Sequence, residues 1–306
     1  MKQIEKKCRF CGKIFITKSK IRNCCSSKCS HKYGAIITKK RDRCFKRIYT
    51  MNDRFLQIES NEKYYFLGLM ASDGNLSSVN KTINISQSGK NGLRLIEYIK
   101  KILDSNYNIL KSKPKKGQMV YGLYMRSKLL WEDLNKNNIV PKKTYDFTIP
   151  NYILEDLQKL KYFLVGYIDG DGCIGVYKNM LSISFVCSFS MYNQLKKLSL
   201  FKRARFSKKK SVMDIRFNGI KALDFCEYLY KDINCFKSYK YEKFIEYKTK
   251  MFNISPKMKY NFIQRELFKE FDKNPNLNCM KYAEEHNLKF QYVYYNRNKW
   301  RQLNGK

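Results

Sequence analysis

Two stretches of the chain show the same succession of strand-type and helix-type patterns of apolar and polar residues. Residues 81–87 alternate apolar with polar side chains, the pattern of a half-buried strand, and residues 93–99 place apolar side chains at helical spacing. A strand over 119–125 and a helix over 128–135 follow. The second stretch repeats these elements over residues 173–177, 181–186, 192–200, 201–206, 213–217 and 220–230. The pattern predicts strands, helix, strands and helix in each stretch.

Each stretch is preceded by an apolar helical run that ends in Asp-Gly, at residues 64–74 and 162–172. A glycine inside a helix costs about 1 kcal/mol relative to alanine, so Gly68 and Gly166 indicate close contact between two helix backbones. We expect the terminal glycines of both runs to be left-handed helix caps. The packing would bring Asp73 and Asp171 together at adjacent helix C-termini, where negative helix ends attract cations. A pair of acids there predicts a divalent-metal site.

The second run, with the sequence LVGYIDGDG at 164–172, and its weaker first copy resemble the motifs of the LAGLIDADG homing endonucleases, in the single-chain form that carries both. The first copy has Ala71 where the second has Asp169. The resemblance implies an α+β fold of two pseudo-symmetric αββαββα halves packed through their motif helices, whose antiparallel sheets form a DNA-binding saddle. The alternative for the pattern is a pair of core helices whose Asp-Gly ends are only caps.

The resemblance also implies roles for individual residues. The final acid of each motif, Asp73 and Asp171, would hold catalytic Mg²⁺. Gln87 is similar to the family's polar active-site residue, and its counterpart in the second half is either Cys187 or Ser188. The family's lysine positions are similar to those of two further catalytic candidates, Lys143 and Lys240.

The charge of the chain indicates a polyanionic partner. Sixty-two Lys and Arg against 26 acids leave a net charge of +36 over 306 residues. This charge favours nucleic acid over a membrane surface as the binding partner. A merely soluble basic protein is the alternative, and any single cluster is more often a solvated face. The candidate DNA-contacting residues are Lys113, Lys115, Lys116, Arg203, Arg205, Lys208, Lys209, Lys210, Arg216, Gln291, Asn298 and Arg301.

The N-terminus has the cysteine spacing of a zinc site. Cys8 and Cys11 are followed by Cys25 and Cys29, and four thiolates at such intervals can close a tetrahedral structural site. Cys24 is a spare beside Cys25, while His31 could replace Cys29. The chain has eleven cysteines but no secretion signal, so we do not expect a disulfide framework. The alternative to structural Zn²⁺ is therefore a set of scattered free thiols.

The last fifty or so residues resemble a helix-turn-helix. Helical patterns cover 262–272, 280–286 and 291–301. Asn287 can take the left-handed conformation of the turn, whereas Asn296 stands where an apolar residue is usual. A generic three-helix tail is the alternative to DNA reading.

These signals divide the chain into a zinc-ribbon-like segment (1–33), a basic linker (34–62), two halves (63–150 and 151–250) and a helix-turn-helix-like module (251–306). No run approaches the roughly 20 apolar residues of a spanning helix, and no hydrophobic signal segment opens the chain. We expect a cytoplasmic protein that stays with the genome of its host compartment and is not secreted or held in a membrane.

The function expected from the resemblance is site-specific double-strand DNA cleavage by Mg²⁺-dependent hydrolysis. The partner would be double-stranded DNA with a long, asymmetric target, bound by a monomer that acts as a pseudo-dimer. Unequal motifs predict that the two strands are cut at different rates. The alternatives are an intron-RNA-binding maturase and a catalytically silent DNA-binding regulator on the same fold.

Overall fold

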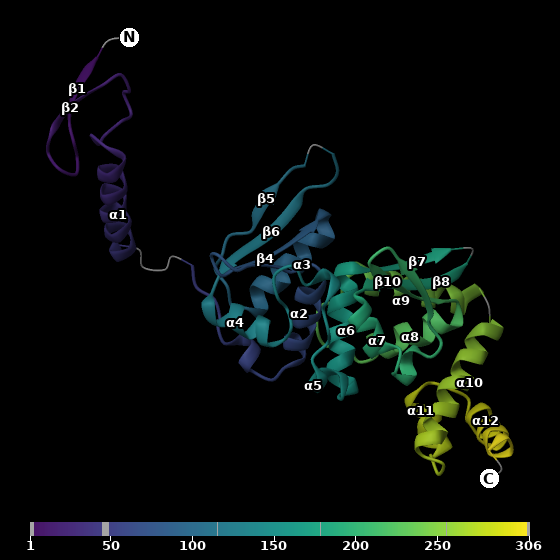
Figure 1. The fold of residues 1–306 in the computed structure, drawn as a ribbon. Helices are drawn as coiled ribbons and strands as arrows, with labels where there is room; N and C mark the ends of the chain where they lie inside the picture. The colour runs from purple at the N-terminus through teal and green to yellow at the C-terminus, as the bar shows by residue number, and fades with distance from the viewer. Residues whose placement is uncertain (1–2, 45–48, 115, 178, 255, 305–306) are drawn as a thin grey trace. The chain divides into compact units, whose positions relative to one another are not determined.

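The computed structural model describes residues 3–44, 49–114, 116–177, 179–254 and 256–304 (Figure 1). It divides into two compact units. One consists of Met1–Met51 with Asp104–Tyr107, and the other of Asn52–Leu103 with Asn108–Lys306. Lys115, one of the candidate DNA contacts, lies outside the described residues.

The smaller unit is a hairpin followed by a helix. Strands β1 (Ile4–Lys7) and β2 (Ile14–Thr17) pair antiparallel, and helix α1 spans Ser27–Cys44. Gly12 in the hairpin loop has a φ of +75°, a conformation that glycine adopts without strain. The hairpin loop carries Cys8 and Cys11, the segment before α1 carries Cys25, and the start of α1 carries Cys29.

The larger unit contains the element order αββαββα twice. The first half is built from α2 (Asn61–Ser72), β3 (Asn75–Ser77), β4 (Thr82–Ser88), α3 (Gly89–Ile102), β5 (Leu110–Ser112), β6 (Val120–Arg126) and α4 (Lys128–Lys136). The second half is built from α6 (Leu157–Asp171), β7 (Gly172–Tyr177), β8 (Met180–Cys187), α7 (Phe189–Leu195), β9 (Arg205–Lys209), β10 (Val212–Asn218) and α8 (Ile220–Tyr230). Short helices lie outside these elements, namely η1 (Phe55–Gln57), η2 (Lys143–Tyr145), α5 (Asn151–Leu154) and η3 (Ser199–Phe201). This order confirms the predicted α+β fold.

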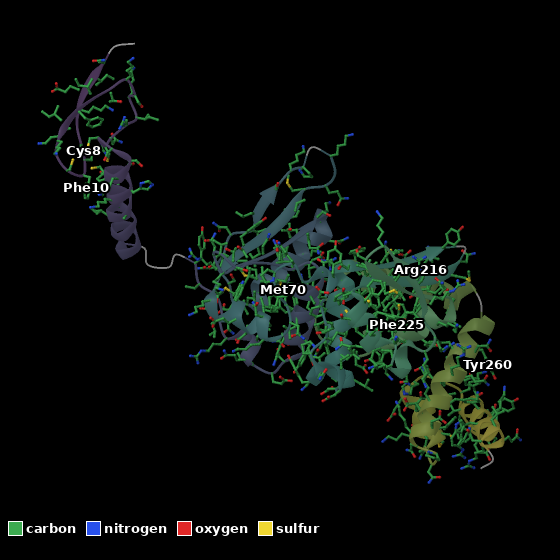
Figure 2. The ribbon with its side chains drawn as sticks, viewed as in Figure 1. Cys8, Phe10, Met70, Arg216, Phe225 and Tyr260 are labelled. Carbon is green, nitrogen blue, oxygen red and sulfur yellow. The ribbon has the colours of Figure 1, made fainter. Side chains whose placement is uncertain are left out.

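Each half forms one four-stranded antiparallel sheet, in the orders β3-β4-β6-β5 and β7-β8-β10-β9. The strand register is the same in the two sheets. Gln87 on β4 pairs with Tyr121 on β6, and Cys187, at the same position of β8, pairs with Met213 on β10. Side chains alternate between the faces of a strand. In the second sheet the inner face is apolar, and Phe217 stacks, with ring centroids 4.2 Å apart, on Phe225 of α8, which is labelled in Figure 2.

The motif helices α2 and α6 pack backbone against backbone, side by side in Figure 1. A Cβ added to Gly68 would lie 1.9 Å from the carbonyl oxygen of Phe163, and one added to Gly166 would lie 1.9 Å from that of Tyr65. No side chain fits at either crossing position. The expectation of close backbone contact at the two internal glycines is confirmed.

Two local expectations were wrong. Gly74 and Gly172 do not have positive φ and are not left-handed caps, and a strand begins at or directly after each of them. Glycine is required there for space, since an added Cβ would lie 2.5 Å from the oxygen of Met70 or Ile168. The strand expected over 201–206 begins only at Arg205, because fully buried Phe201 ends a short helix instead.

Helices α9 (Tyr239–Ile254), α10 (Pro256–Lys273), α11 (Cys279–Glu285) and α12 (Phe290–Leu303) complete the unit. The last three share a small core that consists of Leu267, Phe271, Cys279, Ala283, Val293 and Trp300. Asn287 has a φ of +52°, as expected for the turn. Asn296 is fully buried and accepts a hydrogen bond from Gln264 on α10, which explains a polar residue at an apolar position. Among the described residues, no helix is long and apolar enough to cross a membrane.

Candidate active site at the ends of the motif helices

Two carboxylates meet where the motif helices end. Asp73 caps α2 and Asp171 is the last residue of α6. The helix ends touch closely, because a Cβ added to Gly170 would lie 2.8 Å from a carboxylate oxygen of Asp73. Burial and then repulsion by Asp171 raise the pKa of Asp73 to about 6, and burial also raises the pKa of Asp171. Two acids held this close and partly desolvated favour a bound cation.

The two acids have different polar partners. The Gln87 amide, at the end of β4, donates a hydrogen bond to Asp73. The strand register places Cys187 at the equivalent position in the second half, and burial raises the pKa of this thiol to about 12. Ser188 is occupied elsewhere, since its hydroxyl caps α7 and donates to the carbonyl of Phe147. For Asp171 the attraction of Lys143 and Lys240 opposes the effect of burial on the pKa.

Both lysine candidates bind the ends of the motif helices. The ammonium of Lys143 donates to the carbonyl of Gly74. That of Lys240 donates to the carbonyls of Ile168, Asp169 and Gly170 at 2.6, 2.8 and 3.2 Å. An ammonium has three N–H donors, so in this geometry Lys240 has none left for a phosphate or a water. We therefore interpret Lys240 as a positioning residue, in place of the direct catalytic role implied by the resemblance.

Burial lowers the pKa of both lysines, and the neighbouring carboxylates raise it again. Each buried ammonium is thus balanced by acids across the helix ends. The two acids and the two lysines therefore form one cluster of interacting charges.

A buried polar triad that the sequence did not reveal lies beside this cluster. Asp169 is 5% exposed and accepts hydrogen bonds from Tyr65 of the opposite motif helix, at 2.8 Å, and from Ser238. At the corresponding positions of the first half stand Ala71, Phe163 and Pro141, all three apolar. Where the first half has alanine in place of Asp169, it therefore also lacks both of the hydroxyl groups that donate to this acid in the second half. A position-by-position comparison of the two copies is the signal that could have found Tyr65 and Ser238.

Raised acid pKa values predict that neutralising Asp73 stabilises the metal-free protein. Between about pH 4 and 6 the folded state binds more protons at this carboxyl than the unfolded state, so stability falls as pH rises through that window. We expect Asp73→Asn to raise the free energy of unfolding at pH 7 by on the order of 1–2 kcal/mol, and by less at pH 4.5. Urea unfolding in magnesium-free buffer measures this. Glu155→Gln, at an exposed acid, is the matched control; no gain for Asp73→Asn would contradict the burial of charge.

The four predicted zinc ligands come together in the smaller unit. The Sγ atoms of Cys8, Cys11, Cys25 and Cys29 all lie within 4.8 Å of one another. The Nδ1 atom of His31 instead lies 3.4 Å from the hydroxyl of Ser27, so the geometry favours Cys29 over His31 as the fourth ligand. Four thiols at this separation fit a structural Zn²⁺ ion.

We expect Cys25→Ser to remove the zinc. The wild-type chain should contain about one zinc ion, and the variant much less, because a hydroxyl is a poor replacement for the thiolate. Elemental analysis of protein purified without added metal measures the ratio. Cys173→Ser, at an exposed cysteine outside the cluster, should keep the zinc; equal zinc in the two variants would contradict the site.

The predicted DNA contacts of the second sheet lie on two faces. Cross-strand pairing places Arg205 opposite Arg216, and Lys209 shares their face, away from α8. Lys208 lies on the other face with its ammonium over the ring of Phe189. The remaining candidates have separate locations, with Lys113 and Lys116 exposed after β5, Lys210 in the β9–β10 turn, Arg203 paired with Asp224 on α8, and Gln291, Asn298 and Arg301 on α12.

No protein-family model matches the chain, and no curated protein matches it. Among solved structures it is similar to the LAGLIDADG meganuclease I-AabMI bound to uncleaved DNA, with 16% identity over 65% of this chain and 91% of that chain and a TM-score of 0.42. It is also similar to full-length DUF199/WhiA from Thermatoga maritima, with 15% identity, coverage of 82% and 95%, and a TM-score of 0.39. A third similar structure is the I-LtrWI LAGLIDADG homing endonuclease bound to target DNA, with 14% identity, coverage of 67% and 92%, and a TM-score of 0.41.

Proposed function

We propose that the protein is a Mg²⁺-dependent, site-specific DNA endonuclease that cuts both strands of a long duplex target. The observation that carries the proposal is the meeting of Asp73 and Asp171, one from each half, at the ends of two packed helices. Burial raises the pKa of both acids, and repulsion by Asp171 raises that of Asp73 further. Such a pair fits a divalent metal.

The residues of the site would share the work of phosphodiester hydrolysis. Bound Mg²⁺ would lower the pKa of an attacking water and stabilise the leaving 3′ oxygen. Asp73 and Asp171 would hold the ion, and Gln87 would orient the carboxylate of Asp73 through its hydrogen bond. Lys143 and Lys240 would keep the helix ends in place through their bonds to backbone carbonyls.

Contact with DNA would come from polar and basic faces outside the acids. Arg205, Lys209 and Arg216 share one sheet face, which fits the phosphate backbone and base edges of a duplex. Asp214, on the same face, pairs with Lys209 at 3.4 Å and with Arg216 at 3.3 Å, and so holds both cations in position. The α12 helix and the zinc segment would extend the footprint.

The experiment that tests the proposal begins with recovery of a target. Purified protein is incubated with a library of random duplexes in Mg²⁺, and cut molecules are sequenced; if the reading frame interrupts another gene, the joined flanks are a second substrate. We expect one long, asymmetric sequence, cut on both strands in Mg²⁺ and uncut after chelation of the metal. Selective binding without cutting in Mg²⁺ would overturn the nuclease proposal.

A second candidate function, sequence-specific DNA binding without cleavage, is favoured by one observation. Lys143 and Lys240 already bring two positive charges beside the acids, so the cluster is partly balanced without an ion. A regulator could retain such a cluster as a packing device between its halves. The same selection distinguishes the two functions, because a regulator would enrich bound but intact duplexes.

A further inference from the structure

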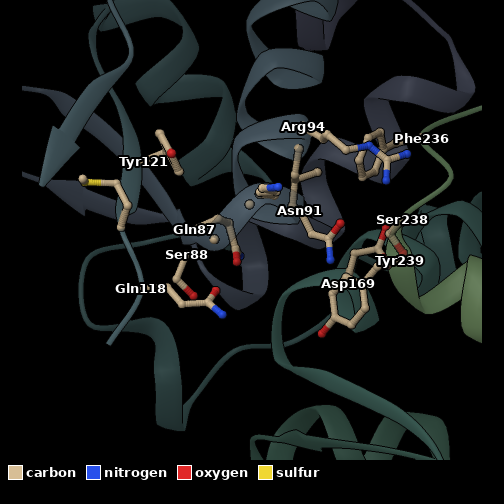
Figure 3. A pocket seen from close by; sticks show the side chains of 15 residues that line it. Gln87, Ser88, Asn91, Arg94, Gln118, Tyr121, Asp169, Phe236, Ser238 and Tyr239 are labelled. Carbon is tan, nitrogen blue, oxygen red and sulfur yellow. The ribbon is translucent and has the colours of Figure 1, made fainter. Parts of the chain in front are cut away.

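A cavity of about 650 Å³ opens next to Gln87, on the first-half side of the acids (Figure 3). Its lining comes from the end of β4, the start of α3, the segment before β6 and the segment that leads into α9. Gln87 lines the cavity and also donates to Asp73, so a molecule bound there is one side chain away from the carboxylate. The volume lies within the range of small-ligand pockets, roughly 300–1,000 Å³.

The polar ends of three side chains face the hollow. Figure 3 shows the amides of Asn91 and Gln118 and the hydroxyl of Tyr239 directed into it from different elements. Arg94 also lines the cavity, and its guanidinium is paired with Glu242 at 3.0 Å. Ser88 caps α3 without a side-chain cap hydrogen bond, so that hydroxyl is not used by the helix.

The equivalent positions of the second half carry different side chains. The register that aligns Gln87 with Cys187 also aligns Ser88 with Ser188, whose hydroxyl accepts from the backbone of Met191 at 3.0 Å. Gly89, with a φ of +74°, corresponds to Phe189, and exposed Asn91 corresponds to Met191, which is fully buried. Apolar residues therefore stand at two positions where the first half has a glycine and an exposed amide.

We infer that this cavity binds the sugar–phosphate backbone of one DNA strand beside the phosphate to be cut, and that the opposite strand has no equivalent site. The inference rests on the proposed function and adds a strand preference to it. Side chains of the cavity are of the kinds that contact phosphate in protein–DNA complexes, namely amide, hydroxyl and guanidinium donors. Asp169 in the wall does not offer a free carboxylate, because Tyr65 and Ser238 both donate to it.

The asymmetry has a consequence for cutting order. The strand whose backbone is held by Asn91, Gln118 and Tyr239 is pre-positioned, and positioning lowers the barrier of a hydrolysis step. The other strand is contacted only by the basic and polar faces outside the cavity. The held strand is cut first, and a duplex nicked in that strand accumulates before the linear product.

The test removes single phosphate charges from the selected target. Duplexes carry one uncharged methylphosphonate at a time near the centre, on either strand, and binding is measured with Ca²⁺ in place of Mg²⁺ to keep the complex uncut. Wild type should bind about tenfold more weakly when the methylphosphonate replaces one or two particular phosphates of one strand, because hydrogen bonds to a charged group are lost. Replacements in the other strand should weaken binding about twofold or less. In Asn91→Ala/Gln118→Ala the loss on the sensitive strand should shrink to about twofold.

Matched variants separate the cavity from general effects. Asn193→Ala/Gln158→Ala removes an exposed asparagine and an exposed glutamine elsewhere and should keep the wild-type strand bias. Asn91→Asp keeps the shape but opposes a phosphate with a negative charge, so it should bind the unmodified duplex more weakly and recover when the contacted phosphate is a methylphosphonate. This variant remains informative if the double alanine variant folds poorly.

The outcomes are distinguishable. Equal sensitivity of the two strands in wild type, or an unchanged bias in Asn91→Ala/Gln118→Ala, would overturn the cavity inference and leave the nuclease proposal standing. A clear bias without any cutting in Mg²⁺ would overturn the nuclease proposal and support the cavity as a backbone site. Absence of DNA binding by the wild-type chain would overturn both.

Discussion

Replacing Asp171 by asparagine should lower the cleavage rate of the selected duplex on the order of 10²–10³-fold while DNA affinity stays within about threefold. Asparagine keeps the shape of the side chain but removes the negative charge, and the carboxylates are the groups of this site that fit a hard cation. The same loss is expected for Asp73→Asn. Strand-resolved cleavage assays with differently labelled strands, combined with binding titrations, measure both quantities.

Two controls make this result interpretable. Glu155→Gln, at an exposed acid on the surface, should cut and bind like wild type. A thermal melt of Asp171→Asn should show a fold at least as stable as wild type, since the substitution removes a charge from a partly desolvated pair. Undiminished cutting by either asparagine variant, with binding unchanged, would mean that the acids are not the metal ligands.

Replacing Gly166 by alanine should destabilise the larger unit by about 3 kcal/mol or more, at the upper end of overpacking substitutions. The added methyl group would lie 1.9 Å from the carbonyl oxygen of Tyr65, and a backbone atom of the partner helix cannot move aside as a flexible side chain can. The motif helices would separate, and the distance between Asp73 and Asp171 would change with them. Chemical denaturation followed by circular dichroism measures the loss.

Gly175→Ala is the matched control for this substitution. A Cβ on Gly175, in strand β7, has open space and a compatible backbone, so its effect should stay within about 1 kcal/mol. Gly68→Ala should resemble Gly166→Ala, because its Cβ meets the carbonyl oxygen of Phe163 at the same distance. A loss below about 1 kcal/mol for Gly166→Ala would contradict the close helix crossing.

Features that depend on local pattern could be predicted from the sequence. The period of apolar residues identified the repeated order of elements, and the left-handed turn at Asn287 follows from the tolerance of asparagine for that conformation. The helix crossing at Gly68 and Gly166 was predicted because an interior glycine is costly unless something approaches it closely. The choice between Cys187 and Ser188 as the counterpart of Gln87 needed the strand register, which cannot be read from a single sequence.

Features that depend on contacts between distant residues were missed or misread. The terminal Asp-Gly of each motif suggested left-handed caps, whereas Gly74 and Gly172 lead straight into strands and are glycine because backbone carbonyls leave no room. The bonds of Lys240 to the end of α6 join residues about seventy positions apart. The same holds for Tyr65 and Asp169, more than a hundred positions apart, and nothing in the local pattern marks either pair.

The central claim, that Asp73 and Asp171 together hold the catalytic metal against DNA, is tested most directly by anomalous diffraction from a complex with the selected duplex and Mn²⁺. We expect anomalous density in contact with a carboxylate oxygen of each aspartate and with a phosphate oxygen of the DNA. Density at that place should disappear in Asp73→Asn/Asp171→Asn crystals. Cut DNA with no metal density at the helix ends would contradict the claim.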